Sequence, residues 1–349
     1  MLPKRAPYRL EFREGAVSRI FFAAEGFEDR TIAWPKELPQ DTVFREGVVF
    51  RYVPEKKSRL EELLGELQPR CTQKIRVVDF HRFEPARSEL QLAVELRDLL
   101  RGVSEVIVDI SVMSKLMIMM LLYALRDFGG TLNVIYSEPV SYAPSEQDYL
   151  KHKDNLEGAL TLPSYGVHQV VRTPALSSAI MQRHPSLVVA FTSFNEQLIR
   201  ALLSNISPAR FFLVNSVPPR LRWRAIAAQE IHRRVIEEYA YDNELEDGQL
   251  KRRCSTLDYE ETFTLLSNIY KNHCYTHRMI VAPTGSKMQA VAASLFKICC
   301  PDVHIEYPTP ESFFIEGFSS PDIEAIHQIT FSQFASFVSG LGREYSLNG

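Results

Sequence analysis

The sequence of 349 residues contains no long hydrophobic run. Its most apolar stretch, Leu116 to Leu125, is far shorter than the ~20 residues that a membrane-spanning helix needs. The first residues lack the pattern of a secretory signal peptide. Charge of neither sign dominates, since 40 Lys and Arg stand against 43 Asp and Glu, for a net charge of −3. We therefore expect a soluble, cytoplasmic protein without a membrane partner, and direct nucleic-acid binding through local basic patches stays open.

Cysteines are few, and none of them lies in a Cys-x-x-Cys pair. An odd number of cysteines without a disulfide framework points to a reducing cytoplasm. Two pairs of residues have spacings known from metal sites. His273 and His277 lack the Glu of a His-Glu-x-x-His helix, and no Pro-Cys-x-x-Cys follows His304 and Glu306. The sequence therefore predicts no metal site, and no motif indicates a cofactor. The five cysteines are Cys71, Cys254, Cys274, Cys299 and Cys300.

Two common enzyme motifs are also missing. Thr284-Gly-Ser-Lys287 resembles the end of a P-loop, but the full Gly-x-x-x-x-Gly-Lys-Ser/Thr spacing is absent. Gly-x-Ser-x-Gly is absent as well, which argues against an α/β-hydrolase nucleophile. A basic stretch runs from Arg220 to Arg253, but glutamates interleave with it, which favours a solvated, salt-bridged helix over a nucleic-acid surface.

A strand–turn–helix pattern is present twice. Val106–Lys115 and Met279–Lys287 are each a β-branched apolar run that ends in small hydroxyl residues and a lysine. Each leads directly into an apolar, helix-favouring segment. The first N–H groups of a helix have no intrahelical partner, and together with the positive end of the helix dipole they attract anions. Each turn is therefore a candidate anion site with a lysine in it.

The repetition extends beyond these turns and predicts an internal duplication. Ser114-Lys115 and Ser286-Lys287 lie 172 residues apart, and three further pairs of segments follow in the same order at similar offsets. The alternative is that any two α/β domains have such units at similar spacing. The paired segments are Ile20–Arg30 with Val188–Gln197, Val48–Pro54 with Phe212–Pro218, and Tyr136–Tyr142 with Tyr307–Phe313.

Strand patterns alternate with helix patterns along both halves. This order predicts an α/β fold with two tandem Rossmann-like domains, each a parallel sheet between two layers of helices, related by duplication and pseudo-twofold symmetry. We place the domains at residues 1–150 and 181–349, with a connecting segment at 151–180 and a C-terminal helix over Ile323–Ser339. Ligands of such sheets bind beyond the carboxyl ends of the strands. There, in the first domain, Glu25–Arg30, Ser111–Lys115 and Tyr136–Ser141 should converge.

The two turns also resemble a known family. Ala282–Ala290 is similar to the Thr-Gly-(Gly/Ser)-(Thr/Ser)-Lys turn of CARF domains, the CRISPR-associated Rossmann-like sensors, and Ile110–Lys115 looks like a degenerate copy without the glycine. Two fused CARF-like units resemble a SAVED domain, a sensor of prokaryotic antiviral defence. The resemblance implies a nucleotide or cyclic oligonucleotide ligand and a separately encoded effector protein. It implies these ligand-binding residues: Gly26, Phe27, Glu28, Asp29, Ser111, Ser114 and Lys115 in one half, and Thr192, Ser193, Asn195, Thr284, Gly285, Ser286 and Lys287 in the other.

Three functions remain open. The first is a nucleotide-binding or nucleotide-sensing module. The second is an enzyme that cleaves a small nucleotide, as a phosphodiesterase or a nucleotide glycosidase. In that enzyme a lysine of the turns would stabilise phosphate charge, and Glu25, Glu28 or Glu138 would act as the base. The third is a scaffold subunit of a defence complex with decayed pockets. Acids lie mainly in the first half and neutral hydroxyls in the second, which fits either acid–base chemistry or recognition of ribose and amine groups.

Overall fold

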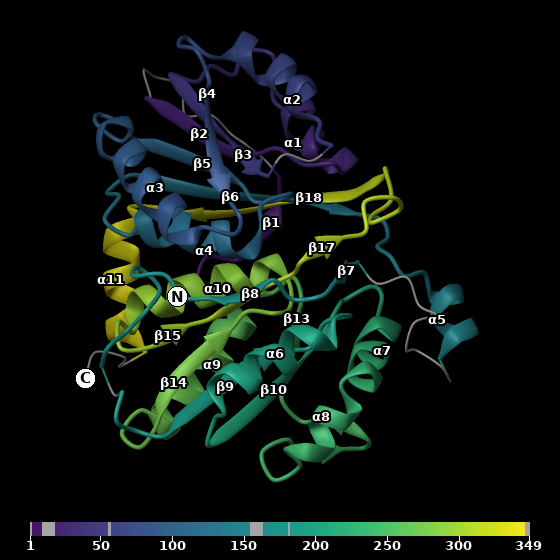
Figure 1. Ribbon diagram of the computed structural model, residues 1–349. Coiled ribbons are helices and arrows are strands. Elements are labelled where there is room, and N and C mark those ends of the chain that lie inside the picture. Colours follow the sequence, from purple (N-terminus) through teal and green to yellow (C-terminus); the bar gives the residue numbers. More distant parts are fainter. Residues whose placement is uncertain (1, 9–17, 55–56, 154–162, 181, 346–349) are drawn as a thin grey trace. The chain divides into compact units, whose positions relative to one another are not determined.

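The computed structural model describes residues 2–8, 18–54, 57–153, 163–180 and 182–345 (Figure 1). By its internal contacts the chain divides into two compact units. Unit 1 comprises Met1–Met117, Ala124–Tyr142 and Gly317–Leu341, and unit 2 comprises Ile118–Tyr123, Ala143–Glu316 and Gly342–Gly349.

Unit 1 is built on a seven-stranded sheet of order β1-β18-β6-β5-β2-β3-β4. The strands from β4 to β6 are all parallel, whereas β18 is antiparallel to β6 and β1 is antiparallel to β18. The first parallel strand, β2, therefore lies at the centre, with the second and third on one side and the fourth and fifth on the other. The bounds are β1 Ala6–Pro7, β2 Arg19–Ala24, β3 Glu46–Val53, β4 Arg76–His81, β5 Glu105–Asp109, β6 Thr131–Pro139 and β18 Ile323–Phe331.

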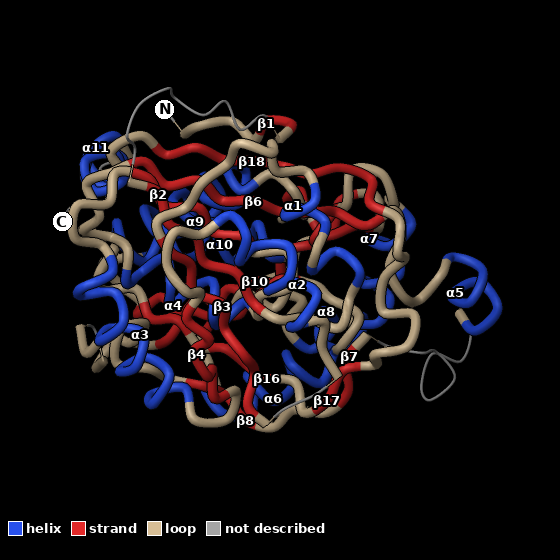
Figure 2. Tube along the Cα trace, turned by 90° about the horizontal axis from the view of Figure 1, so that it is seen from above, coloured by secondary structure: helices blue, strands red, loops and turns tan. Residues whose placement is uncertain are grey.

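Helices cover both faces of this sheet. Figures 1 and 2 show α1 and α2 on one side of the strands and α3 on the other. On the first side Phe21 of β2 packs edge-on against Trp34 of α1 and against Phe44, and all three are fully buried. The next residue of β2, Phe22, is buried on the opposite face. The bounds are η1 Asp29–Thr31, α1 Ala33–Lys36, α2 Leu60–Leu67, η2 Gln68–Arg70, α3 Pro85–Leu99, α4 Lys115–Ala124 and α11 Phe334–Glu344.

Unit 2 contains a five-stranded parallel sheet of order β13-β10-β9-β14-β15. Helices α6 and α8 pack on one face of it, where Ile199, Leu202 and Val235 join the core. The sheet strands are β9 Ser186–Phe191, β10 Arg210–Val217, β13 Arg253–Ser255, β14 Arg278–Ala282 and β15 His304–Ile305. The helices are α5 Glu146–His152, α6 Glu196–Ile206, α7 Trp223–Ile231, α8 Arg233–Glu238, α9 Tyr259–His273 and α10 Lys287–Cys299. Three two-stranded pairs complete the unit: β7 Ser164–Tyr165 with β17 Ser312–Phe313, β8 Gln169–Val171 with β16 Tyr307–Thr309, and β11 Leu245–Glu246 with β12 Gln249–Leu250.

Both units share one strand order. In chain order the parallel strands of each sheet are arranged third, second, first, fourth, fifth. This is the Rossmann-like arrangement, so the predicted α/β fold class is confirmed. The shared order is what a duplication would produce, and the duplication and its pseudo-twofold symmetry stay predictions.

The C-terminal region differs from the prediction. Ile323–Ser339 was expected to be a helix, but residues 323–331 form β18 and α11 begins only at Phe334. The reason is that residues 323–331 pair with β6, and the resulting strand has the alternating burial of a sheet: His327, Ile329 and Phe331 are buried, while Thr330 between them is exposed. Because β18 pairs with β6, residues 317–341 belong to unit 1, and residues 143–180 belong to unit 2.

The charged segment from Trp223 to Ala240 has a sequence that predicts one helix, but the structure divides it at His232 into α7 and α8. The sequence also predicts a short edge strand around Tyr8–Phe12, which falls largely on residues 9–17 and so lies outside the described residues; the neighbouring β1 at Ala6–Pro7 lies at the edge of the sheet.

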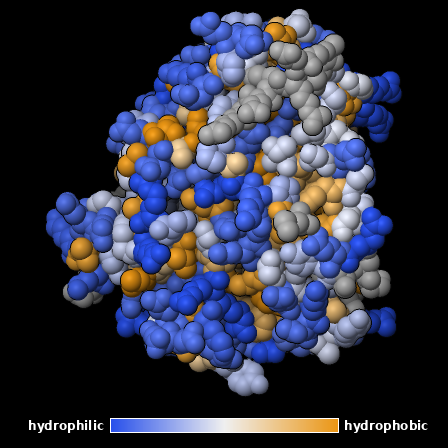
Figure 3. All heavy atoms as spheres, turned by 180° about the vertical axis from the view of Figure 1, so that it is seen from behind, coloured by the Kyte–Doolittle hydropathy of each residue, from blue (hydrophilic) through white to orange (hydrophobic). Residues whose placement is uncertain are grey.

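No helix in the described part of the chain is both long enough and apolar enough to cross a membrane. On the face that Figure 3 shows, hydrophilic residues predominate and hydrophobic residues form small groups among them.

Candidate functional site

In unit 1 the predicted loops do converge at the carboxyl ends of the parallel strands. Central β2 and its neighbour β5 lead into helices on different sides, so their carboxyl ends form the topological switch point. The two loops there nearly touch: a Cβ added to Gly26 would lie 2.7 Å from Cβ of Val112. On the other side of β5, the backbone N–H of Ser137 donates to Oγ of Ser111 at 2.8 Å. The convergence predicted from the sequence is therefore confirmed.

The turn from Ser111 to Lys115 is held rigidly by side chains. Asp109, at the end of β5, accepts hydrogen bonds from the backbone N–H of Ser111 (2.9 Å) and from its hydroxyl. The phenol oxygen of Tyr52 accepts from the backbone N–H of Ser114 at 2.6 Å, and Oγ of Ser114 accepts from the backbone N–H of Met117 at 3.2 Å. Ser111 and Ser114 thus have structural roles in shaping the turn before α4.

Lys115 is the first residue of α4 and is partly buried. Burial lowers the pKa of its ammonium group to about 8. The group therefore still carries its charge at neutral pH, close to the positive end of the helix dipole. A phosphate at this turn would be attracted by both.

The three carboxylates proposed as catalytic bases all have partners inside unit 1. Oε1 of Glu25 accepts from the backbone N–H of Tyr52 and Oε2 from the hydroxyl of Ser58, both at 2.8 Å. Glu138 contacts Nε2 of His327 at 2.8 Å, and Arg5 lies 2.7 Å from the other ring nitrogen of His327. These contacts hold the carboxylates of Glu25 and Glu138 in place and occupy hydrogen-bond acceptor positions on each of them.

Glu28 belongs to a buried ion-pair cluster. Its Oε1 accepts from Nη2 of Arg30 at 2.8 Å, and its Oε2 accepts from the hydroxyl of Ser319 at 2.6 Å. Nη1 of Arg30 donates to the hydroxyls of Tyr136 and Tyr142, each at 3.4 Å. Burial opposes the charge of Arg30, but Glu28 and the two tyrosines outweigh it and raise the pKa of the guanidinium above its ordinary value. Glu28 and Arg30 therefore have a structural role, because they connect the loop after β2 to Tyr136 of β6.

The remaining predicted residues of this loop are more accessible. Phe27 is partly buried and packs edge-on against Phe318, with ring centroids 5.5 Å apart. Asp29 is exposed and forms an ion pair with Arg59.

In unit 2 the loop after β9 is equally well bonded. Oγ1 of Thr192 donates to the side chain of Asn215 at 3.1 Å and accepts from the backbone N–H of Ser216 at 2.9 Å. Asn195 caps α6 by accepting from the backbone N–H of Gln197 at 3.1 Å, and the backbone N–H of Asn195 donates to Oγ of Ser193 at 3.3 Å. These hydroxyls and amides fix the start of α6.

The Thr-Gly-Ser-Lys turn of unit 2 approaches β9 closely. Oγ1 of Thr284 accepts from the backbone N–H of Phe191 at 3.0 Å. Ser286 and Gln289 form a capping box at the start of α10: Oγ of Ser286 accepts from the N–H of Gln289 at 3.1 Å, and the Gln289 side chain accepts from the N–H of Ser286 at 2.7 Å. Lys287 is the first residue of α10 and is partly buried. The predicted Thr192–Asn195 and Thr284–Lys287 loops therefore flank the same switch point, between β9 and β14.

Several residues near these turns were missed. Tyr52 positions the turn before α4, and burial raises the pKa of its phenol to about 12, against the opposing effects of Ser114 and Arg82. Ser216 and Gln289 contact each other at 3.3 Å beneath the turn of unit 2. Tyr52, Arg82 and Ser216 lie at the carboxyl ends of β3, β4 and β10, so the rule for parallel sheets could have identified them.

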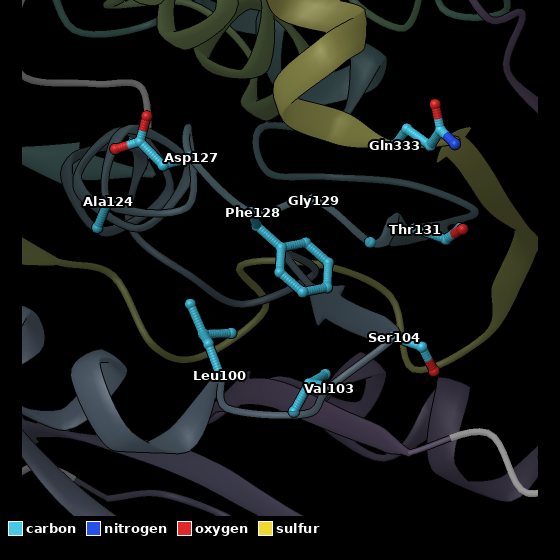
Figure 4. Close-up of a pocket in the computed structure, with 10 residues that line it drawn as sticks. Leu100, Val103, Ser104, Ala124, Asp127, Phe128, Gly129, Thr131 and Gln333 are labelled. Carbon is cyan, nitrogen blue, oxygen red and sulfur yellow. The ribbon is translucent and has the colours of Figure 1, made fainter.

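One pocket of unit 1 lies at the opposite end of the sheet. It has a volume of about 500 Å³ and is lined mainly by small and apolar residues from the loops that precede β5 and β6. Figure 4 shows the Phe128 ring at its centre, with Leu100 and Val103 on one side. Asp127 is the one charged residue among its lining residues, so the pocket has no cation for a phosphate. Among the described residues, moreover, no group of three or more His, Cys, Asp or Glu could hold a metal ion.

Comparison with known proteins adds no family. No protein-family model and no curated protein sequence matches the chain. Among similar solved structures is one described as a crystal structure of LpCGTa in complex with UDP, with 11% identity, 95% coverage of each chain and a TM-score of 0.25. A likeness at this TM-score carries no argument about ligand or activity. The Rossmann-like fold class accordingly rests on the strand order of the two sheets.

Proposed function

We propose that the chain is a binding module for an anionic nucleotide, a mononucleotide or a cyclic oligonucleotide, and that it acts through a separately encoded partner. One observation carries the proposal. In each unit, a lysine is the first residue of the helix that follows the fourth parallel strand: Lys115 begins α4 and Lys287 begins α10. An ammonium group, a helix N-terminus and a topological switch point thus coincide twice.

The setting of this proposal comes from the resemblance of the two turns to CARF and SAVED sensors. It suggests that the nucleotide is a signal of prokaryotic antiviral defence and that binding controls an effector protein. Pre-formed turns support the role of a receptor. Asp109, Tyr52 and the capping box of Ser286 and Gln289 hold both turns in place, so little conformational entropy would be lost on binding.

The enzyme alternative has less support. A general base needs a carboxylate that can accept a proton from the substrate or a water. Glu25, Glu28 and Glu138 each accept hydrogen bonds or an ion pair from neighbouring residues instead. No observation favours the scaffold alternative.

A thermal-shift screen against mononucleotides, dinucleotides and cyclic oligonucleotides tests the proposal. A ligand at a hundredfold excess over its dissociation constant should stabilise the protein by about 2.7 kcal/mol. Lys115→Ala and Lys287→Ala should reduce or abolish this shift. Lys251→Ala is the matched control, because Lys251 is an exposed lysine whose partner is Glu244, and it should leave the shift unchanged. A folded protein that shifts with none of these nucleotides would reject the proposal, and turnover of a bound nucleotide would favour the enzyme.

The affinity for an anionic nucleotide should fall as the pH rises through about 8. Burial lowers the pKa of Lys115 to about 8, so below this pH the ammonium is charged and attracts phosphate. A bound phosphate favours the charged form of Lys115, so the affinity decreases gradually above this pH. Because one proton is involved, the decrease is at most about tenfold per pH unit. Calorimetric titrations at about pH 7 and about pH 9.5 would measure it. Lys115→Arg keeps its charge, so the affinity of this variant should stay constant. An equally flat profile for the wild type would contradict the role of Lys115.

A further inference from the structure

A cluster of basic and aromatic side chains lies near the amino ends of β10 and β14 in unit 2, away from the Lys287 turn at the carboxyl end of β14. It comprises Arg210 at the start of β10, Arg252 just before β13, and His273 and His277 around the turn that leads into β14. Figure 1 shows β10 and β14 in one sheet, where β9 lies between them. Segments far apart in the sequence therefore contribute to one surface.

Phe212 is the centre of this cluster. The guanidinium carbon of Arg252 lies 4.0 Å from the centroid of its ring, and that of Arg210 lies 5.1 Å from it. The ring of His273 packs edge-on against Phe212 at 5.5 Å, and His277 packs against His273 at 5.6 Å. Cation–π contacts thus hold both guanidinium groups near one ring despite their like charge.

Basic groups outnumber acids in this cluster. Asp242 forms an ion pair with Arg210 at 2.7 Å, and the charge of Glu244 acts on Arg252. Burial first, and then the charges of Arg210 and its neighbours, lowers the pKa of both His273 and His277, while Asp242 opposes this effect. The charges of Arg210 and Arg252 contribute to the lowered pKa of His273, and a bound anion would offset this contribution.

Exposed aromatic rings border the basic groups. Tyr241 is 91% exposed and Tyr275 is 84% exposed, although large aromatic side chains are ordinarily covered. Arg210 lies over the ring of Tyr241 at 5.8 Å, and Tyr275 lies between the two histidines in the sequence. Flat aromatic rings beside cations are the surface on which the bases of single-stranded nucleic acids stack while their phosphates pair with Arg and His.

We propose that this surface of unit 2, the Phe212 surface, binds single-stranded nucleic acid. Bases would stack on Tyr241 and Tyr275, and phosphates would contact Arg252 and the two histidines. An acidic protein segment would satisfy the cations but would leave the two exposed rings without a stacking partner, so nucleic acid is the better match. Within unit 2, the site is separate from the Lys287 turn at the carboxyl end of β14.

Fluorescence anisotropy with labelled oligothymidylate and oligouridylate tests this inference on the full chain. We expect binding at low salt that weakens as salt rises, by a slope of about −0.7 for each phosphate contacted in a plot of log K against log salt. Tyr241→Ala and Tyr275→Ala should each lower the affinity about tenfold through lost stacking. Both side chains are exposed, so the variants should fold, which circular dichroism would check.

Matched controls separate this site from the rest of the chain. Tyr165→Ala removes an exposed tyrosine elsewhere in unit 2 and should leave oligonucleotide binding unchanged. Absence of binding at low salt, or binding that the two tyrosine variants do not weaken, would overturn the inference. Binding of polyglutamate in preference to the oligonucleotides would also overturn it and would assign the surface to an acidic protein.

Discussion

Replacing Arg30 with methionine should lower the free energy of unfolding by about 3–5 kcal/mol. Arg30 and Glu28 form an ion pair at 2.8 Å, and their side chains are only 3% and 7% exposed. Removal of the guanidinium would leave the Glu28 carboxylate buried without a counter-ion, and the hydroxyls of Tyr136 and Tyr142 would each lose a donor. A buried charge without a partner costs more than the loss of the pair itself.

Urea denaturation would measure the effect. In the double variant Glu28→Gln, Arg30→Met the carboxylate is gone, so part of the stability should return. Arg59→Met is the matched control, because Arg59 pairs with the exposed acids Asp29 and Glu62 and its loss should cost less than about 1 kcal/mol. Equal losses for Arg30→Met and Arg59→Met would contradict a structural role for the buried pair.

This buried ion pair also shows what the sequence alone could and could not establish about the three candidate catalytic acids. The sequence placed Glu25, Glu28 and Glu138 correctly at the carboxyl ends of β2 and β6. It could not show their partners, since Tyr52, Ser319 and His327 come from distant parts of the chain. An acid at a strand end is equally compatible with catalysis and with a buried ion pair. Only the fold distinguishes them.

The strands could be predicted because the preference of the local sequence and the packing within the sheet favour the same conformation. Val106–Asp109 and Met279–Ala282 are short apolar runs rich in β-branched residues, and each becomes a fully buried parallel strand. The helix predicted over residues 323–331 was wrong for the opposite reason. Their alternating pattern is weak, and pairing with β6 decides their conformation. Such long-range pairing is not visible in a local pattern.

The glycines of the two switch points show a further limit. The turn of unit 1 lacks the glycine of Thr284-Gly285-Ser286, and from the sequence this absence made the turn look degenerate. In the structure, Gly26 on the opposite loop allows the close approach. Each switch point thus has one glycine where two loops meet, on β2's loop in unit 1 and on β14's loop in unit 2. Both switch points therefore require a glycine where the two loops meet, although the glycine lies on a different loop in each unit.

Gly285→Ala should therefore lower the free energy of unfolding by about 3 kcal/mol. Its Cβ would lie 1.9 Å from the side-chain oxygen of Gln289 and 2.9 Å from Cβ of Phe191. The Gln289 side chain would have to move, which breaks its hydrogen bond from the N–H of Ser286 and thus the capping box of α10. Overpacking costs about 1–3 kcal/mol and a lost cap about 1 kcal/mol. Gly26→Ala, whose Cβ would lie 2.7 Å from Cβ of Val112, should be destabilising for the same reason.

Gly65→Ala provides the matched control for the same substitution. Gly65 lies within α2, and no atom would lie within 4 Å of its added Cβ. Alanine favours a helix over glycine by up to about 1 kcal/mol, so this variant should be slightly more stable than the wild type. Urea denaturation of the three variants would compare them directly. If Gly285→Ala and Gly26→Ala were as stable as Gly65→Ala, the two loops at each switch point would have room to separate, and the turns would not be the rigid anion receptors that we propose.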